Sequence, residues 1–231
     1  MSNTISKICH TELTKDDIKY LKQDKSRIQI NNNVLFNFGT NVIPQTDLSG
    51  HVLVSMPSAN YDSLLSNALV YIASHDKNGG AFGFILNSRI GSTSWSDIVK
   101  NDNTIFRSSL VDIYSGGIEQ QGKGFILHSQ DYNHDLLFSS NTSKINVSCN
   151  NEIINSIVYE NRPNKYLFIT GSTTWKKHQL EREVMSNMWM ILNPSFAQHF
   201  IFSKAKEDSW ALAMNAIGIN VALYMSRVGS D

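Results

Sequence analysis

The chain has 231 residues and a formal net charge of zero, from 20 basic and 20 acidic side chains. This length suffices for one substantial core, and a hydrophobic fraction of 41% excludes an intrinsically disordered chain. Basic and acidic residues are mixed along the whole sequence, which disfavours direct binding to nucleic acid through its phosphates. Even the local basic cluster is diluted by neighbouring glutamates; it consists of Lys176, Lys177, His178 and Arg182.

The two cysteines, Cys9 and Cys149, are too few for a structural zinc site, which needs about four ligands. We therefore expect no bound metal, and no sequence motif implies another cofactor. No apolar stretch reaches the roughly 20 residues of a transmembrane helix, and the N-terminus lacks the apolar run of a signal peptide. These features favour a soluble, cytoplasmic protein whose cysteines are reduced.

The N-terminal part of the chain differs in composition from the rest. Thr14 can cap a short helix, but the apolar stripe that follows it is weak, and a polar stretch begins at Asn31. We predict a partly ordered N-terminal extension over residues 1–45 and a single domain over residues 46–231. No internal repeat or long linker divides that domain.

From His51 onward the pattern becomes typical of β-strands separated by turns. We predict strands over residues 51–56, 68–75 and 81–86, and Pro57 ends the first of them. The second and third are joined at Asp76 to Gly80, where Asn78 and Gly79 can supply the positive φ of a hairpin turn.

The central part of the chain continues this pattern with one short helix. Ser94 and Asp97 have the spacing of a capping box, so we predict a helix that runs through Val99. The most apolar strand follows later and should be central in the sheet; it covers residues 165–170. Further strands are predicted over residues 111–114, 124–128, 136–139 and 144–148.

Two helices are predicted near the C-terminus. In the first, Leu180, Val184 and Met188 recur at intervals of four residues and form one core-facing stripe. The second begins near Asp208 and ends at Gly218, a residue suited to the position after a helix; we expect it to bury Trp210, Ala213 and Ile217. Strands in runs with only a few helices indicate the α+β class.

Four motifs occur in an order that resembles the YqgE/AlgH family. The first is Met56-Pro57 with Val70-Tyr71-Ile72, His75 and the run Gly-Ala-Phe-Gly-Phe-Ile-Leu-Asn at residues 80–87; the second is Gly116-Gly117 with Gly124-Phe-Ile-Leu-His128; the third is Gly171 to Trp175 with Gln179-Leu180-Glu181 and Glu183; the fourth is Ile201-Phe202 with Trp210, Ala213 and Gly218. The similarity extends from about His51 to Asn220.

The resemblance implies an α+β fold whose mostly antiparallel sheet curls into a pseudo-barrel flanked by a few helices. It also implies a regulatory function, because some family members have been linked to transcriptional control of polysaccharide synthesis. The resemblance specifies no chemical activity, ligand or oligomeric state.

Three polar residues at predicted strand ends are candidates for a ligand pocket. His75 and Asn87 bracket one hairpin, so both could lie at the same end of the sheet, and His128 ends another strand. Together they could line a polar pocket or form part of a metal site. Each could equally serve the fold by satisfying nearby backbone groups, as buried polar side chains usually do.

A second group of candidates lies around the helix that follows the central strand. Trp175, Gln179 and Glu183 recur at intervals of four residues and could form a recognition ridge with an aromatic anchor. The same spacing is compatible with a tryptophan that covers the core. Glu181 and Glu183 would project about 200° apart on a helix, so they are not a catalytic carboxylate pair.

The sequence contains no nucleophile motif or phosphate-binding loop. Ser115 precedes two glycines, but it lacks the context of a nucleophile elbow, and the run Gly122-Lys123-Gly124 lacks the spacing of a phosphate loop. We therefore favour a non-catalytic regulatory or interaction protein that acts through another protein, with a link to transcription. The alternative is a small-ligand binder or enzyme that uses the pocket around His75, Asn87 and His128.

Overall fold

The computed structural model describes residues 47–57, 64–99, 110–159, 161–203, 206, 208–216, 219 and 221. The N-terminal extension predicted over residues 1–45 lies outside these ranges, and so do Ile217 and Gly218 at the predicted end of the last helix. In the described part of the chain, no helix has the length and apolar character that a membrane crossing requires.

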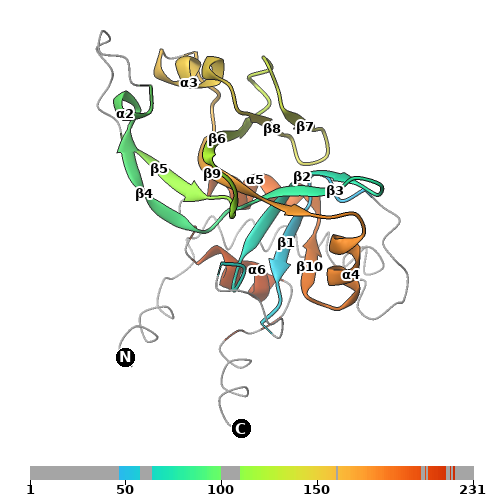
Figure 1. Cartoon of the computed structure of the whole chain (residues 1–231). Helices are drawn as coiled ribbons and strands as arrows, with labels where there is room; N and C mark the ends of the chain where they lie inside the picture. Colours follow the sequence, from blue (N-terminus) through green and yellow to red (C-terminus); the bar gives the residue numbers. More distant parts are fainter. Residues whose placement is uncertain are drawn as a thin grey trace, which may run out of the picture.

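The described strands form one 10-stranded sheet with a few short helices, as the α+β expectation predicted (Figure 1). Its main path runs in the order β10-β1-β2-β3-β9-β6-β8-β7, with β5 bridging β9 and β4. The strands are β1 (Val52–Ser55), β2 (Leu69–Asp76), β3 (Gly80–Ile85), β4 (Arg89–Ser94), β5 (Leu110–Ser115), β6 (Glu119–Ser129), β7 (Phe138–Ser140), β8 (Ile145–Ser148), β9 (Tyr166–Trp175) and β10 (Trp189–Leu192). β5 and β9 run parallel, and the other strand pairs of the described residues are antiparallel.

The central strand, β9, joins the two halves of the sheet. Its first half pairs with β5 on one side and β6 on the other, and its second half pairs with β3. Between the halves, Gly171 has a φ of 74°, and a Cβ there would lie 2.7 Å from the backbone oxygen of Gly117. Glycine is required at this bend because other residues rarely adopt positive φ and because no space exists for a side chain.

The sheet curls without closing, since β10 and β7 remain the two ends of its main path. The curl brings the Tyr71 hydroxyl on β2 within 3.1 Å of the Ser143 hydroxyl in the turn before β8. Apolar side chains from both halves fill the interior, among them Tyr71, Phe84 and Phe125, together with Phe200 from a helix that packs on the sheet. This arrangement agrees with the predicted pseudo-barrel curl.

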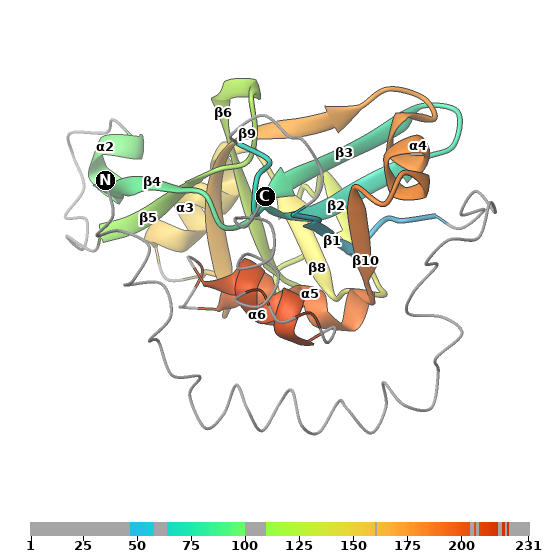
Figure 2. The ribbon, with the colours of Figure 1, turned by 90° about the horizontal axis from the view of Figure 1, so that it is seen from below.

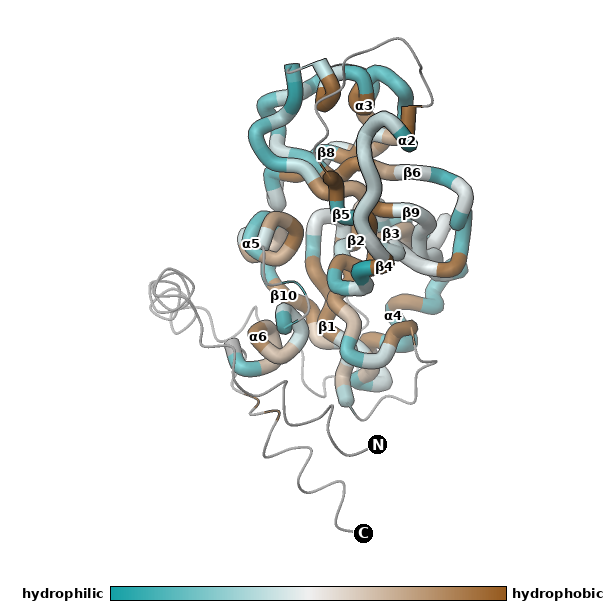
Figure 3. The backbone as a smooth tube through the Cα atoms, turned by 90° about the vertical axis from the view of Figure 1, so that its left-hand side faces the viewer, coloured by the Kyte–Doolittle hydropathy of each residue, from teal (hydrophilic) through white to brown (hydrophobic). Residues whose placement is uncertain are grey.

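The helices cover the curled sheet on different sides. Figure 2 shows α5 and α6 along one side, with β4 and β5 at one end of the molecule and α4 at the other. In Figure 3 the hydrophobic colour follows β1 and parts of α5 and α6, whereas the exposed tip of β6 is hydrophilic. The helices are α2 (Trp95–Val99), α3 (Asn151–Val158), α4 (Gln179–Met185), α5 (Ala197–Phe202) and α6 (Ser209–Ala216), with a 3-10 turn, η3 (Pro194–Phe196), before α5.

Most of the predicted strands are confirmed, each within a few residues of its predicted limits except where β6 and β9 are longer. The expected positive φ at Asn78 or Gly79 was wrong, because it occurs at Gly80 with a φ of 99°. The Asp76 side chain instead holds the turn by accepting the Asn78 N–H at 2.8 Å. Elements without a clear pattern were not predicted: β4, β10, α3 and α5.

Candidate functional site

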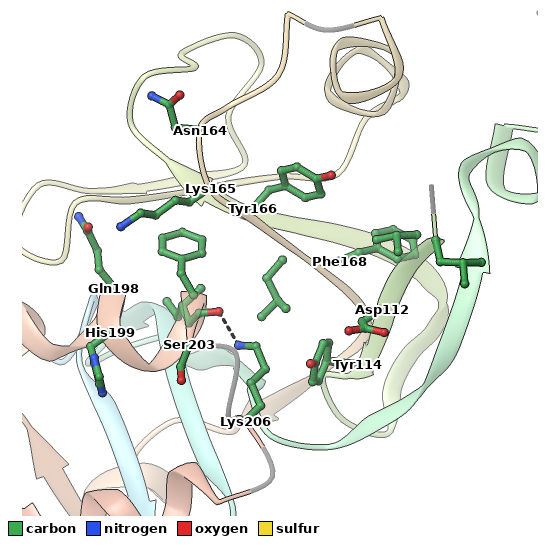
Figure 4. A pocket seen from close by; sticks show the side chains of 15 residues that line it. Asp112, Tyr114, Asn164, Lys165, Tyr166, Phe168, Gln198, His199, Ser203 and Lys206 are labelled. Atoms are coloured by element: carbon green, nitrogen blue, oxygen red, sulfur yellow. Dashed lines mark hydrogen bonds between the residues drawn. The ribbon is translucent and has the colours of Figure 1, made fainter. Parts of the chain in front are cut away.

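A cavity of about 950 Å³ lies between β5, the beginning of β9 and α5 (Figure 4). Such a volume falls within the range of small-molecule pockets, roughly 300–1,000 Å³. Its lining combines aromatic and aliphatic side chains with a few charged groups: Leu110, Val111, Asp112, Tyr114, Asn164, Lys165, Tyr166, Leu167, Phe168, Gln198, His199, Ile201, Phe202, Ser203 and Lys206.

Lys206 is the buried cation of this cavity, with only 5% of its surface exposed. Its Nζ donates to the backbone oxygen of Phe200 at 3.2 Å and to that of Ile201. These oxygens belong to the last turn of α5, where carbonyls lack partners within the helix and the helix dipole favours a positive charge. The fold thus uses the lysine to cap α5 and places it against the cavity.

The Lys206 ammonium also lies over an aromatic ring. Its Nζ is 5.2 Å from the centroid of the Tyr114 ring on β5, a geometry that attracts a cation to the π face. Figure 4 shows Lys206 beside Tyr114, with Tyr166 on the opposite side of the cavity. Burial lowers the pKa of Lys206 to about 7, because the charged form loses solvation by water.

Aromatic rings of β9 form a rigid wall. Phe168 is 6% exposed, and its ring centroid lies 5.9 Å from that of Trp95 on α2. The Tyr166 ring lies 6.0 Å from the same tryptophan. Because Trp95 is itself buried, it holds both rings in place, and such pairs favour tilted or edge-on geometries.

The acidic group of the lining, Asp112, is already paired. Its Oδ1 accepts from the Ser92 hydroxyl at 2.6 Å and from Arg89 Nη2 at 2.8 Å. The Ser92 hydrogen bond and then the Arg89 guanidinium lower the pKa of this carboxyl. Asp112 therefore stays ionised at neutral pH and is balanced by arginine, so the unbalanced charge of the cavity is positive.

His75 lies near the turn end of β2, where its side chain is fixed by the fold. Its Nδ1 accepts the Leu48 N–H at 3.1 Å, and its Nε2 is 3.3 Å from Oε1 of the buried Glu181 on α4. The second oxygen of Glu181 is buried without a hydrogen-bond partner among the described residues. His75 thus connects the segment before β1 to α4, away from the cavity described above.

Asn87 lies at the opposite end of the same hairpin. Its Oδ1 accepts the Leu69 N–H at 2.9 Å and its Nδ2 donates to the Asn67 oxygen at 2.8 Å. From Leu69 to His75 the strand rises about 3.3 Å per residue, so the two ends are roughly 20 Å apart. The expectation that His75 and Asn87 share one end of the sheet was wrong, because they bracket the hairpin at its turn and at its open end.

His128 lies in the other half of the sheet and is fully buried. Its Nε2 is 3.1 Å from the Ser148 hydroxyl on β8, and its Nδ1 is 3.0 Å from the Ser129 oxygen. Burial lowers the pKa of this imidazole. Because β3 and β9 separate β2 from β6, the fold does not bring His75, Asn87 and His128 into one pocket.

The second predicted group, Trp175, Gln179 and Glu183, does come together in the structure. Glu183 Oε2 accepts the Trp175 Nε1–H at 2.8 Å, and Glu183 Oε1 accepts from Gln179 Nε2 at 2.9 Å. Trp175 was expected on the same helical row as the other two, but it ends β9 and meets α4 from the sheet. A further tryptophan, Trp189 on β10, donates to the same Oε2 at 2.7 Å. Ligand binding by Trp175, Gln179 and Glu183 stays a prediction.

Sequence reasoning missed the cavity. Its strongest feature is Lys206, but this lysine occurs in the polar run Ser-Lys-Ala-Lys-Glu-Asp at residues 203–208, where no pattern distinguishes it. Lys165 was included in a predicted strand without a role. In the described part of the molecule, no group of three or more histidine, cysteine, aspartate or glutamate side chains is arranged to hold a metal ion.

Comparison with known proteins identifies relatives over most of the chain. A UPF0301 protein of Rickettsia prowazekii is 35% identical over 185 residues, which cover 80% of this chain and 96% of the relative. A UPF0301 protein of Rickettsia africae is 36% identical over 186 residues, with the same coverage of both chains.

Two solved structures share the fold. The solution structure of the AlgH protein from Pseudomonas aeruginosa superposes with a TM-score of 0.62 at 23% identity, covering 80% of this chain and 97% of that one. A crystal structure of a protein from Corynebacterium diphtheriae gives a TM-score of 0.58 at 18% identity, covering 77% and 91%. The AlgH-like family model matches residues 52–222, so this chain belongs to the AlgH-like (YqgE/AlgH) family, as the four sequence motifs predicted.

Proposed function

We propose that this protein is a non-catalytic regulatory protein that binds a small molecule in the cavity between β5, β9 and α5. The observation that carries the proposal is the cavity of about 950 Å³, with aromatic walls and a buried lysine. Ligand sites are typically concave and mostly apolar, with a few placed polar groups that orient the ligand.

The chemistry of the lining supports binding more than acid–base catalysis. A general acid or base works best when its pKa lies near the operating pH and a substrate proton is within reach. The Asp112 pKa is instead lowered by Ser92 and Arg89, which occupy Oδ1. Burial does lower the Lys206 pKa to about 7, but hydrogen bonds to two backbone oxygens at the end of α5 fix its Nζ, which suits a binding group.

A bound molecule would contact an element that extends away from the core. β5 contributes Val111, Asp112 and Tyr114 to the cavity, and its partner β4 forms the outer edge of this two-stranded arm (Figure 1). Ile90 on β4 and Leu110 on β5 are 60% and 73% exposed. The regulatory output that we propose, control of transcription through a partner protein, would pass through this arm.

A thermal-shift screen of metabolites tests the proposal. Ligand binding to the folded state raises its stability by about 2.7 kcal/mol at a ligand concentration of 100 times Kd. We expect at least one compound to raise the melting temperature of the wild type, and Gln198→Trp, which fills the cavity from α5, to abolish that rise. Ile118→Trp is the control, because Ile118 is 70% exposed and does not line the cavity.

Two results would contradict the proposed function. If no compound stabilises the wild type at millimolar concentration, the protein is not a small-molecule binder. If a compound stabilises the wild type and Gln198→Trp equally, the molecule binds elsewhere and this cavity is not the site.

A further inference from the structure

We infer that the cavity binds a planar aromatic monocarboxylate, whose carboxylate pairs with Lys206 and whose ring packs against the aromatic wall. This inference rests on the proposed function and gives its ligand a chemical class. It follows from the charge balance of the lining, the free hydrogen-bonding capacity of one lysine and the shape of the wall.

The charge balance selects an anion. The cations of the described lining are Lys165 and Lys206, and its carboxylate, Asp112, is paired with Arg89 at 2.8 Å. Lys165 is exposed at the rim, with its Nζ 5.9 Å from the Phe202 ring, whereas Lys206 is 5% exposed. A ligand carboxylate at Lys206 would be shielded from water, where ion pairs are stronger than at a surface.

The hydrogen bonds of Lys206 favour a ligand that carries a single negative charge. An ammonium has three N–H donors, and Lys206 directs two of them to the backbone oxygens of Phe200 and Ile201. The described residues supply no hydrogen-bond acceptor for the third donor, and the ammonium lies beside the face of Tyr114. One donor and one buried positive charge suit a carboxylate, while a doubly charged phosphate would require more donors than this part of the lining offers.

The aromatic side chains that line the cavity favour a planar ligand. Tyr166 and Phe168 are held by Trp95 with ring centroids 6.0 and 5.9 Å from it, and Phe202 adds another ring from α5. Rings that are fixed before binding lose little conformational entropy when they contact a ligand. They also favour a planar aromatic partner, because offset or edge-on ring pairs are more stable than the buried area alone accounts for.

Binding of a carboxylate should be accompanied by proton uptake. Burial lowers the pKa of Lys206 to about 7, so a substantial fraction of the side chain is neutral near pH 7.5. A nearby anion favours the charged form and raises this pKa again. The other titratable groups that line the cavity are Asp112 and Tyr114 on β5, Lys165 just before β9, Tyr166 on β9, and His199 on α5. Burial alone accounts for the lowered lysine pKa.

Isothermal titration calorimetry with 2-naphthoate tests the inference on the full-length wild-type protein. We expect 2-naphthoate to bind at least about tenfold more tightly than the neutral isostere 2-naphthamide, the gain typical of one charged hydrogen bond. Titrations at pH 7.5 in phosphate and in Tris, whose ionisation enthalpies differ, should reveal net proton uptake. Cyclohexanecarboxylate, which lacks an aromatic ring, and 2-naphthyl phosphate should both bind more weakly.

Two lysine variants show which lysine is responsible for the carboxylate preference and the proton uptake. Lys206→Met should remove the preference for the carboxylate and the proton uptake, whereas Lys165→Met should weaken binding less and leave the uptake unchanged. If Lys206→Met fails to fold because it loses the cap on α5, the comparison of naphthoate with naphthamide on the wild type still decides the question.

Several outcomes would overturn the inference. They are equal affinity for 2-naphthoate and 2-naphthamide, tighter binding of the phosphate, and equal binding of the cyclohexane compound. If any of these occurs while another compound stabilises the wild type but not Gln198→Trp, the proposed function stands and only the ligand class is wrong.

Discussion

Trp175 donates its indole N–H to the Glu183 carboxylate, with 2.8 Å between Nε1 and Oε2. The same oxygen accepts the indole N–H of Trp189 at 2.7 Å. Trp175 ends β9 and Trp189 begins β10, so one carboxylate on α4 joins two strands that are not neighbours in the sheet. Both tryptophans are buried, so their N–H groups depend on this acceptor.

Replacing Glu183 with alanine should therefore destabilise the fold. Two buried indole donors would lose their partner, and each unsatisfied buried donor costs about 1–3 kcal/mol. We expect Glu183→Ala to lower the free energy of unfolding by about 2–4 kcal/mol in urea denaturation. Arg182→Ala, at an exposed position of the same helix, should change it by less than about 0.5 kcal/mol. Similar losses in the two variants would contradict this account of Glu183.

Gly171 should tolerate no side chain, because β9 bends there. Its φ of 74° opposes substitution, and so does the Gly117 oxygen, which would lie 2.7 Å from an added Cβ. We expect Gly171→Ala to lower the free energy of unfolding by more than about 1 kcal/mol. The matched control is Gly122→Ala, because a Cβ at Gly122 meets no described atom within 4 Å. A Gly171 variant as stable as the Gly122 variant would refute the proposed constraint.

His128 should make the protein less stable in mild acid. Its folded-state pKa is lowered from 6.5 by burial, so the unfolded chain binds a proton more readily below that pH. The free energy of unfolding is then highest above pH 6.5 and decreases as the pH falls below it. Urea denaturation at pH 7.5 and pH 5 should show a smaller loss for His128→Gln than for the wild type, with His51 contributing in the same direction in both. Equal losses would exclude this role of His128.

Lys206 should have the corresponding effect in the alkaline range. Its pKa is about 7 in the folded protein against 10.5 in the unfolded chain, so between these values the unfolded chain binds more protons. The contribution of Lys206 to stability therefore increases from pH 7 to about pH 10. Lys206→Met should lack this increase when unfolding is measured at pH 7 and 9.5. A wild type whose pH dependence matches that of Lys206→Met would show that the buried lysine keeps an ordinary pKa.

Much of the sheet could be predicted from the sequence because its strands carry local signals. The strand predicted over residues 165–170 corresponds, from Tyr166 on, to the first half of β9, the strand that joins both halves of the sheet. The capping-box spacing of Ser94 and Asp97 is matched by the Asp97 N–H that donates to the Ser94 hydroxyl at 3.3 Å. Such signals involve residues that are close in the sequence, so they can be recognised before the fold is known.

The cavity could not be predicted because it depends on contacts between distant segments. Lys206 lies over the ring of Tyr114, although the two residues are 92 positions apart in the sequence. Neither residue has a sequence neighbour that suggests this contact. Strand β4 has mostly small polar residues, and all of its side chains are partly or largely exposed, so no apolar alternation marks it. His75 and Asn87 were placed at one end of a hairpin by proximity in sequence, whereas strand length separates them.

The claim that this protein binds a small molecule between β5, β9 and α5 is tested most directly by locating the bound compound. An NMR titration of isotope-labelled protein with the strongest stabiliser from the thermal-shift screen measures which backbone amides respond. We predict that the amides of Val111, Tyr114, Phe168 and Phe202 shift, while those of α4 stay unchanged. Shifts that concentrate around α4 and Glu183, or that spare the cavity, would contradict the account.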